Sequence, residues 1–207
     1  MGSDCFRHFE QKSAVFDALL ELLCERPFSE VGVADVLERS RISRSAFYRL
    51  FPGMKGVVVW HTEMCSALGT FAIGRHLTCA QGHRVSIGLL ADASALYANL
   101  FRWWSYDYSL PAVNAHVDAM ACELRERGIA MSARTEYELA GVAHSSHEIA
   151  CRWFNGGMNV PVDELVDIIV SLYPSWLREE LDSPREPLDP AQLAVRLMGE
   201  SGRRNRS

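Results

Sequence analysis

Residues 40–51 read SRISRSAFYRLF and combine three arginines with three aromatic residues. Ser43 is a favourable N-cap, so we expect a helix that begins at Arg44 and ends before Pro52. At helical spacing the apolar side chains fall on one side: Ala46, Phe47, Leu50 and Phe51. The other side is polar and basic: Arg44, Ser45, Tyr48 and Arg49. The stretch therefore predicts a helix with one packing face and one cationic face.

Two further helices are expected before it, over Gln11–Glu25 and Val33–Arg39. Two short helices joined by a turn of about three or four residues, the second with a basic face, describe a helix-turn-helix. In such a motif the second helix enters the major groove of DNA with its N-terminal residues at base edges. Arg44 could then reach a guanine edge, while Tyr48 and Arg49 suit phosphate oxygens. The alternative is a basic face that is merely solvated.

The charge distribution indicates a local basic surface on an acidic chain. The formal net charge is -5 and the pI is about 5.8. Residues 1–60 hold eight Lys or Arg and eight Asp or Glu, so the remainder carries the whole negative charge. No acidic residue lies between Glu38 and Glu63, whereas this interval holds five cations: Arg39, Arg41, Arg44, Arg49 and Lys55. Such a patch is typical of a nucleic-acid footprint that the net charge conceals.

Composition and hydropathy predict an all-α protein located in the cytoplasm. Apolar residues make up 48% of the 207 and recur at three- and four-residue spacing, while strand-type alternation is nearly absent. No apolar run approaches the roughly 18 residues of a membrane span, and the first residues lack the apolar middle of a signal peptide. The six cysteines are scattered without a CxxC pair, which favours reduced thiols.

The remainder divides into long predicted helices. They are expected over residues 55–76, 84–103, 111–127, 133–154 and 162–181. Pro111 suits the first position of its helix, and Pro174 should disturb the last one. The segment DSPREPLDP is predicted to be a loop and GRRNRS a frayed basic tail. The expected organisation is a helix-turn-helix domain at 8–54, a larger helical domain at 55–182 and a C-terminal segment at 183–207.

An aromatic cluster suggests a ligand pocket. Six aromatic residues lie between Tyr97 and Tyr108 and could line an apolar pocket with a few polar groups. The only charged residue that stands out among them is Asp107, so an apolar or aromatic small molecule is the expected ligand. The alternative is a plain aromatic core at a helix end. The candidate ligand-binding residues are Phe71, Tyr97, Phe101, Trp104, Tyr108, His116 and Met120.

The two late helices have the pattern of an oligomer interface. Apolar residues repeat at three and four in the last helix, and small residues in the preceding one permit close approach. The alternative is that both helices pack into the core of the monomer. The candidate interface residues are Ala140, Gly141, His144, Val162, Leu165, Ile169 and Leu172.

Signals for catalysis and metal binding are weak. His144, His147 and Cys151 fall at i, i+3 and i+7 of one helix, a spacing that can hold zinc, but no fourth ligand is evident. We therefore expect neither a metal nor another cofactor. The chain has no nucleophile motif, phosphate loop or paired carboxylates, so we do not expect an enzyme. A helical enzyme that uses the aromatic pocket with His116 or His144 is the remote alternative.

Residues 12–60 resemble the DNA-binding region of the TetR family of transcriptional regulators. The matching features are the first helix AVFDALLELL, the second helix VADVL, the pattern IS-R-S-A-FY-R-L-F and the turn into a long fourth helix. The resemblance implies a small DNA-binding domain on a larger helical domain that binds a ligand and dimerises. It implies DNA contacts at Ser43, Arg44, Ser45, Tyr48 and Arg49, with Lys55 near phosphate. It also implies a ligand-responsive homodimer on palindromic double-stranded DNA, usually a repressor.

The sequence departs from the family pattern in several places. Arg41 stands where the family turn has glycine, and Gly32 replaces the usual threonine cap of the second helix. A left-handed backbone costs a non-glycine residue on the order of 1–2 kcal/mol, so Arg41 should carry strain. Ala46 and Leu50 replace family Thr and His or Tyr, and Met54 replaces the usual Lys, with Lys55 one place later. Fewer phosphate contacts are expected, and a protein-interaction module with a degenerate helix-turn-helix is the second hypothesis.

Overall fold

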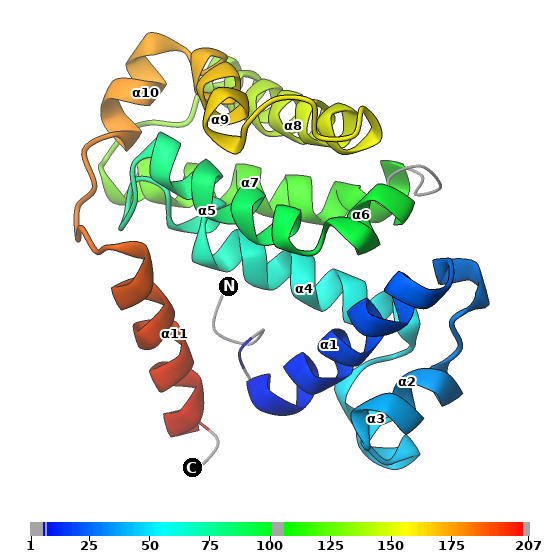
Figure 1. The fold of residues 1–207 in the computed structure, drawn as a ribbon. Coiled ribbons are helices and arrows are strands. Elements are labelled where there is room, and N and C mark those ends of the chain that lie inside the picture. Colours follow the sequence, from blue (N-terminus) through cyan, green and yellow to red (C-terminus); the bar gives the residue numbers. More distant parts are fainter. Residues whose placement is uncertain (1–5, 7, 101–105, 205–207) are drawn as a thin grey trace.

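The computed structural model describes residues 6, 8–100 and 106–204, with side chains up to residue 97 and again from 110 to 198. The described chain is all-helical, as expected, and contains one isolated bridge, between Ile73 and Leu77. No helix in the described part is long and apolar enough to cross a membrane. In Figure 1 the first three helices form one end of the molecule, and α4 connects them to the larger body.

The N-terminal helices are α1 (Phe9–Glu25), α2 (Val33–Ser40) and α3 (Arg44–Leu50), with a 3-10 turn η1 (Phe28–Glu30) after the first. They share a small core in which Leu19, Val36 and Phe47 are fully buried, one from each helix. This packing confirms the predicted helix-turn-helix and leaves the polar face of α3 outside.

Helix α4 (Met54–Leu68) ends eight residues earlier than the sequence predicts. The cause is Ser86, whose hydroxyl donates to the Cys65 carbonyl (3.0 Å) and accepts from the Thr70 N–H (3.0 Å). These two groups would otherwise continue the helix ladder. The chain turns instead through Gly69 into the 3-10 turn η2 (Thr70–Ala72).

Glycine is required where α4 meets the next helix. A Cβ on Gly69 would lie 2.2 Å from the Ser86 hydroxyl and 2.4 Å from the Gly82 carbonyl. A Cβ on Gly82 would lie 2.3 Å from Ile73 Cγ1. The two glycines therefore allow a close crossing of backbones that any side chain would push apart.

The expected helix over 84–103 is wrong in its bounds. The structure has α5 (Cys79–Asp92) and α6 (Ser94–Leu100), separated at Ala93. The start was missed although the sequence carries its signal: Thr78 and Gln81 form a capping box, in which the Thr78 hydroxyl accepts the Gln81 N–H and the Gln81 side chain accepts the Thr78 N–H.

The expectation for Pro111 is also wrong. Helix α7 (Tyr106–Glu126) begins five residues before the proline, so Pro111 lies inside it and removes one hydrogen bond to the carbonyl of residue 107. Helix α8 (Ala133–Asn155) agrees closely with its expected range. Helices α9 (Val162–Ser171) and α10 (Ser175–Leu181) are separated at Pro174, as predicted.

The C-terminal helix α11 (Pro190–Arg204) was not expected and extends into the predicted frayed tail as far as residue 204. Leu193 packs with Ala72 and Leu77 in a small second cluster. The segment before α11 pairs with the turn after η2, because the Arg185 and Glu186 N–H groups donate to the Gly74 and Arg75 carbonyls. Residues 205–207 of the predicted tail lie outside the described part.

An ion cluster, here called the C-terminal clasp (Glu123, Arg127 and Arg185), holds this segment against α7; the side chains of Glu123 and Arg127 are largely buried and that of Arg185 is partly exposed. The Glu123 carboxylate accepts from Arg127 (2.9 Å) and from Arg185 (2.7 Å). Arg127 also donates to the carbonyls of Gly74 (2.6 Å) and Ser183 (3.0 Å). Glu123 and Arg127 of α7 together tie this helix to the turn at Gly74 and to the segment of Ser183 and Arg185.

Candidate nucleic-acid interface

Helix α3 is fixed by an N-cap residue at its start and by a buried phenylalanine ring on its inner side. The Ser43 hydroxyl accepts the Ala46 N–H (3.2 Å), so Ser43 is the N-cap that the sequence predicts. On the inner side Phe47 is fully buried, with Phe51 at a ring-centroid distance of 5.8 Å. A buried ring on a short helix restricts how the helix can rotate, so its outer face is presented in one orientation.

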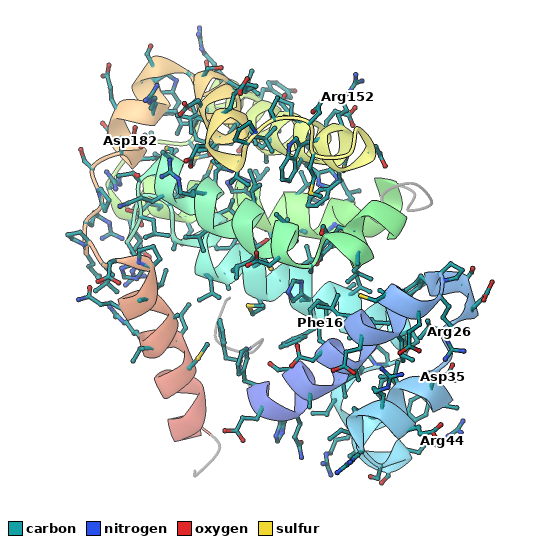
Figure 2. The ribbon with its side chains drawn as sticks, viewed as in Figure 1. Phe16, Arg26, Asp35, Arg44, Arg152 and Asp182 are labelled. Atoms are coloured by element: carbon teal, nitrogen blue, oxygen red, sulfur yellow. The ribbon has the colours of Figure 1, made fainter. Side chains whose placement is uncertain are left out.

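The outer face of α3 is exposed and basic. Arg44, Ser45, Tyr48 and Arg49 are all exposed, Tyr48 by 48%. The Arg44 guanidinium lies 5.7 Å from the centre of the Tyr48 ring, a cation–π distance, and Figure 2 shows Arg44 on the outer side of α3. The structure therefore brings these four of the six predicted contacts onto one surface.

Arg39 and Arg26 have structural roles near this surface. Arg39 bonds Glu21 (3.1 Å) and Glu25 (2.8 Å), which joins α2 to α1. Arg26 pairs with Asp35 (2.9 Å). These pairs are exposed and screened by solvent, so they orient the helices more than they stabilise the fold. The sequence counts Arg39 in the basic patch, but its charge is used within the protein.

Asp35 supplies the other half of a capping box at the start of α2, where the N-cap Gly32 has no side chain. Its carboxylate accepts the Gly32 N–H (2.8 Å), and this bond, followed by the one from Arg26, holds the pKa of Asp35 below its ordinary value. The turn after α2 contains Arg41 at φ 56° and ψ 24°, which confirms the predicted left-handed backbone. A cap and a turn of unusual composition therefore still give the helix-turn-helix geometry.

Lys55 lies exposed in the first turn of α4, near the end of α3. The short connection depends on Gly56, where a Cβ would lie 2.6 Å from Pro52 Cδ. Lys12, which the sequence analysis did not single out, has its ammonium 5.9 Å from the ring centres of both Phe51 and Trp60.

Behind the interface, α1, α4 and α6 are joined by an aromatic contact. Phe16 of α1 stacks on His61 of α4 with centroids 3.9 Å apart and planes 7° apart. His61 Nδ1 lies 2.8 Å from the Tyr97 hydroxyl. Burial lowers the pKa of His61 to about 4, so the ring is neutral at pH 7.

The hydrogen positions in this contact follow from donor counting. The Thr62 hydroxyl donates to the Val58 carbonyl (3.1 Å), so it can only accept from Tyr97 (3.1 Å). Tyr97 thereby uses its single proton, and its oxygen accepts from His61 Nδ1–H. We assign the Nδ1–H tautomer of His61 on this ground.

The predicted ligand residues do not all meet in one described place. Tyr97 is 2% exposed and packs between His61 and Phe154, while Phe71 is half-buried at the edge of the core. His116 and Met120, one turn apart on α7, are buried elsewhere, with His116 beside His83. Three further predicted residues have side chains outside the described part: Phe101, Trp104 and Tyr108.

His116 is an unusual buried group. It is 6% exposed, and its Nε2 has no hydrogen-bond partner among the described residues. Leaving such a group unsatisfied costs about 1–3 kcal/mol. Burial lowers the pKa of His116 to about 4, so the ring is neutral. The neighbouring His83, at a centroid distance of 5.7 Å, bonds the Tyr173 hydroxyl through Nε2 (2.8 Å).

The predicted interface residues separate into two groups. Leu165 and Ile169 are buried inside the same chain, so they are not available to a partner in this conformation. Leu172 is 42% exposed, Gly141 is exposed, and three members are half-buried: Ala140, His144 and Val162. Two exposed apolar residues nearby were not among the predicted interface residues: Tyr137 (79% exposed) and Ile168 (43% exposed).

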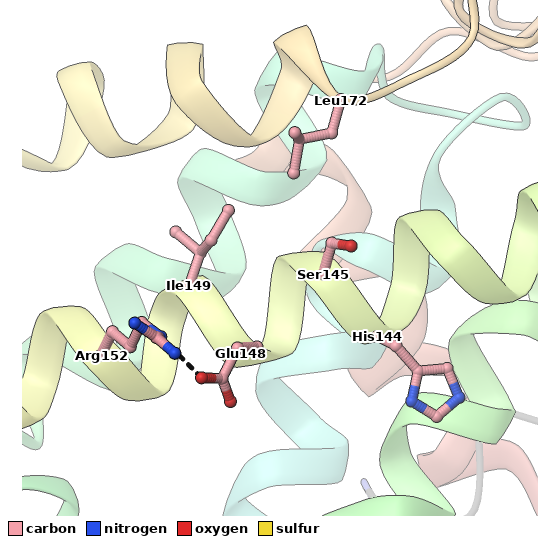
Figure 3. A pocket seen from close by; sticks show the side chains of 6 residues that line it. All are labelled: His144, Ser145, Glu148, Ile149, Arg152 and Leu172. Atoms are coloured by element: carbon pink, nitrogen blue, oxygen red, sulfur yellow. Dashed lines mark hydrogen bonds and ion pairs between the residues drawn. The ribbon is translucent and has the colours of Figure 1, made fainter.

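A groove lies between α8 and α9 on this surface. Figure 3 shows Ile149 and Leu172 pointing toward one another across it, with the Glu148–Arg152 ion pair (2.6 Å) on α8 beside them. Cys151 Sγ lies 3.4 Å from His147 Nε2, while His144 lines the groove. The described residues contain no group of three or more His, Cys, Asp or Glu that could hold a metal ion.

These features define a helix-turn-helix DNA-binding domain on a larger helical body. Residues 15–59 match the family described as "Bacterial regulatory proteins, tetR family". Among solved structures, the dihydroxyacetone kinase operon activator DhaS superposes with a TM-score of 0.60 at 14% identity, covering 83% of this chain and 96% of its own. A TetR-family transcriptional regulator from Streptomyces coelicolor gives 0.52 at 18% identity, covering 94% and 98%. A comparison with curated protein sequences gives no match.

The family match and the shared fold agree with one another. Residues 15–59, which include the helix-turn-helix, match the tetR family, and the chain shares the fold of the TetR-family regulator from Streptomyces coelicolor.

Proposed function

We propose that this chain is a ligand-responsive transcriptional repressor that binds a palindromic operator as a homodimer. The observation that carries the proposal is the exposed basic face of α3, held outward by the fully buried Phe47. Arg44, in the first turn, reaches base edges, and Tyr48, Arg49 and Lys55 contact phosphates on either side. A bidentate arginine–guanine contact discriminates bases by about 1–3 kcal/mol.

The proposed homodimer accounts for binding to a palindromic operator. Two copies related by a two-fold axis present two α3 helices to successive major grooves. The proposed interface is the outer face of α8 and α9, since Ile168 and Leu172 are exposed there beside the groove. This surface keeps Leu172, Gly141 and His144 from the predicted set and replaces Leu165 and Ile169, which the monomer already buries.

Ligand response needs a physical link between the two parts of the chain. The stacked Phe16–His61 pair and the His61–Tyr97 hydrogen bond support α4 and α6 as that link. A ligand that favours a different placement of α6 would shift α4, and with it α1–α3, only as far as it prefers that conformation. The proposed effector is an uncharged, mostly apolar small molecule.

The DNA-binding proposal is tested by selection of random DNA followed by titration at several salt concentrations. Arg44→Ala should cost about 1–3 kcal/mol on the selected site and lose sequence preference, whereas Tyr48→Phe should weaken binding to all sequences. Arg84→Ala is the matched control, because it removes the same charge from an exposed residue of α5.

The same measurements distinguish this proposal from the second hypothesis, a protein-interaction module with a degenerate helix-turn-helix. If the wild-type protein selects no sequence and is not retained on DNA at low salt, the helix-turn-helix is an interaction module and the proposal fails. If DNA binding survives unchanged in both α3 variants, the recognition surface has been misassigned.

A further inference from the structure

Arg41 occupies a strained backbone conformation without forming a polar contact among the described residues. Its φ of 56° lies in the left-handed region, and it is one of three non-glycine residues with a positive φ in the described chain. Its side chain is exposed and forms no hydrogen bond or ion pair with any described residue. Glycine would adopt this backbone without a steric penalty. A strained residue whose side chain finds no partner within the protein points to a partner outside it.

The charge of Arg41 is not neutralised by its neighbours. Arg39, two positions earlier, is held by two carboxylates of α1. The nearest carboxylate to Arg41 along the chain is that of Glu38, which is exposed and forms no ion pair with it in the described structure. The next acidic residue after Arg41 is Glu63, in α4. An exposed cation in this setting attracts an anion from solution.

The turn places Arg41 beside the polar face of α3. Ile42 packs against the core, whereas Arg41 and the N-cap Ser43 on either side of it are exposed. Arg41 lies three residues before Arg44, so their Cα atoms are at most about 11 Å apart. In a helix-turn-helix the first helix crosses the phosphate backbone and the second enters the major groove, which is about 12 Å wide. A cation in the turn between these helices therefore lies at the edge of the groove, where the phosphates are.

We propose that Arg41 binds a backbone phosphate at the edge of the major groove, and that the strained turn persists because it holds this charge there. The inference rests on the proposed DNA binding and adds to it a contact outside the polar face of α3. A guanidinium suits this partner, because its donors form a fixed fork that matches two phosphate oxygens. A phosphate contact carries no sequence information, so Arg41 contributes affinity on every sequence while Arg44 contributes sequence preference.

Three variants separate the charge from the backbone strain. Arg41→Gly removes both, Arg41→Ala removes the charge and keeps the Cβ, and Arg41→Lys keeps the charge and the Cβ. On the site that the wild-type protein selects from random DNA, both neutral variants should bind on the order of tenfold more weakly. The slope of log K against log salt should become shallower by about 1.8 for a dimer, or about 0.9 for each phosphate. Arg41→Lys and the control Arg84→Ala should keep the wild-type slope.

Thermal unfolding and repeated selection separate a phosphate contact from the other roles that Arg41 could have. Arg41→Gly relieves the strained turn, so its Tm should equal or exceed that of the wild type while its DNA affinity falls. The site that Arg41→Gly selects should have the wild-type sequence, because a phosphate contact does not read bases. Neutral variants that keep the wild-type affinity and salt slope overturn the inference. So does a changed site sequence, which would make Arg41 a base contact.

Neutral replacement of single phosphates locates the contact. Each phosphate of the selected site is exchanged in turn for an uncharged methylphosphonate. At one position in each half-site, the exchange should weaken the wild-type protein and leave the affinity of Arg41→Ala unchanged; the absence of such a position overturns the inference. A wild-type protein that binds no DNA refutes the proposed function as well. Sequence-selective binding that Arg41→Gly and Arg41→Ala leave intact refutes the inference alone.

Discussion

Arg41 holds a backbone conformation that suits glycine. Its φ of 56° places it in the left-handed region, at a cost on the order of 1–2 kcal/mol for a non-glycine residue. Arg41→Gly should therefore raise the free energy of unfolding by about 1 kcal/mol, less any entropy that glycine adds to the unfolded chain. Urea denaturation measures the change.

The control for this prediction is Arg41→Ala, which removes the same charge and keeps the Cβ. A stability gain in the alanine variant equal to that in the glycine variant would show that the side chain, and not the backbone, is responsible.

At the level of single residues, the sequence predicted local geometry well and partners poorly. The Ser43 cap and the strain at Arg41 follow from short-range rules, so both were predictable. The ion pairs of Arg39 with Glu21 and Glu25 join residues 14 and 18 positions apart. No periodicity reports such pairings, because they depend on how two helices cross.

The helices α8 and α9 carry the proposed dimer surface. Replacing both Ile168 and Leu172 with arginine places two desolvated cations in each protomer at that surface, which would strongly disfavour association. We expect the wild-type protein to be a dimer at micromolar concentration and the double variant to be a monomer, by light scattering coupled to size exclusion.

The matched control is Val195→Arg, since Val195 is 73% exposed on α11, away from this surface. A monomeric wild-type protein would contradict the proposed dimer. A double variant that stays dimeric would show that the interface lies on another surface.

Helix bounds were predictable only where local residues set them. Pro174 separates α9 from α10, and both sides of that break follow from the sequence. The end of α4 depends on Ser86, which lies 16 residues beyond Thr70, so the sequence gives no local sign of it. Helix α11 was missed for a similar reason: its apolar side packs on Ala72 and Leu77, far back along the chain.

The C-terminal clasp should make the stability of the whole molecule depend on pH. Burial opposes ionisation of Glu123, but the hydrogen bonds from Arg185 and Arg127 outweigh it and hold the pKa of Glu123 below its ordinary 4.5. A lowered folded-state pKa contributes stability above the unfolded-state value, and this contribution is lost as the pH falls through the folded-state pKa.

Glu123→Gln should therefore lower the free energy of unfolding near neutral pH by about 1–3 kcal/mol, less than for a fully buried ion pair because Arg185 is partly exposed. The difference from the wild type should shrink below about pH 4.5, as followed by urea denaturation. Glu179→Gln, at an exposed position of α10, is the control. A difference that stays constant with pH would mean that the Glu123 charge is not what holds the clasp.

Communication across the molecule should depend on one hydroxyl group. Tyr97→Phe removes the oxygen that accepts from His61 and the proton that Thr62 accepts. The amides of α1 and α4 should then exchange faster with solvent, because the contact between α6 and α4 is weakened. Hydrogen exchange followed by mass spectrometry tests this, with the exposed Tyr137→Phe as control. Unchanged exchange in α1 and α4 would exclude the Tyr97 hydroxyl from the link.

The glycine crossing of α4 and α5 has a consequence for evolution within this fold. Gly69 and Gly82 leave no room for a Cβ, whatever ligand or operator a protein binds. The exposed outer face of α3 is free to diverge with the DNA sequence that a protein binds. In descendants that keep this helix crossing, we expect the two glycines to be retained after the residues of that face have changed. The pair should then mark the correct alignment even when overall identity has fallen as low as the 14% shared with DhaS.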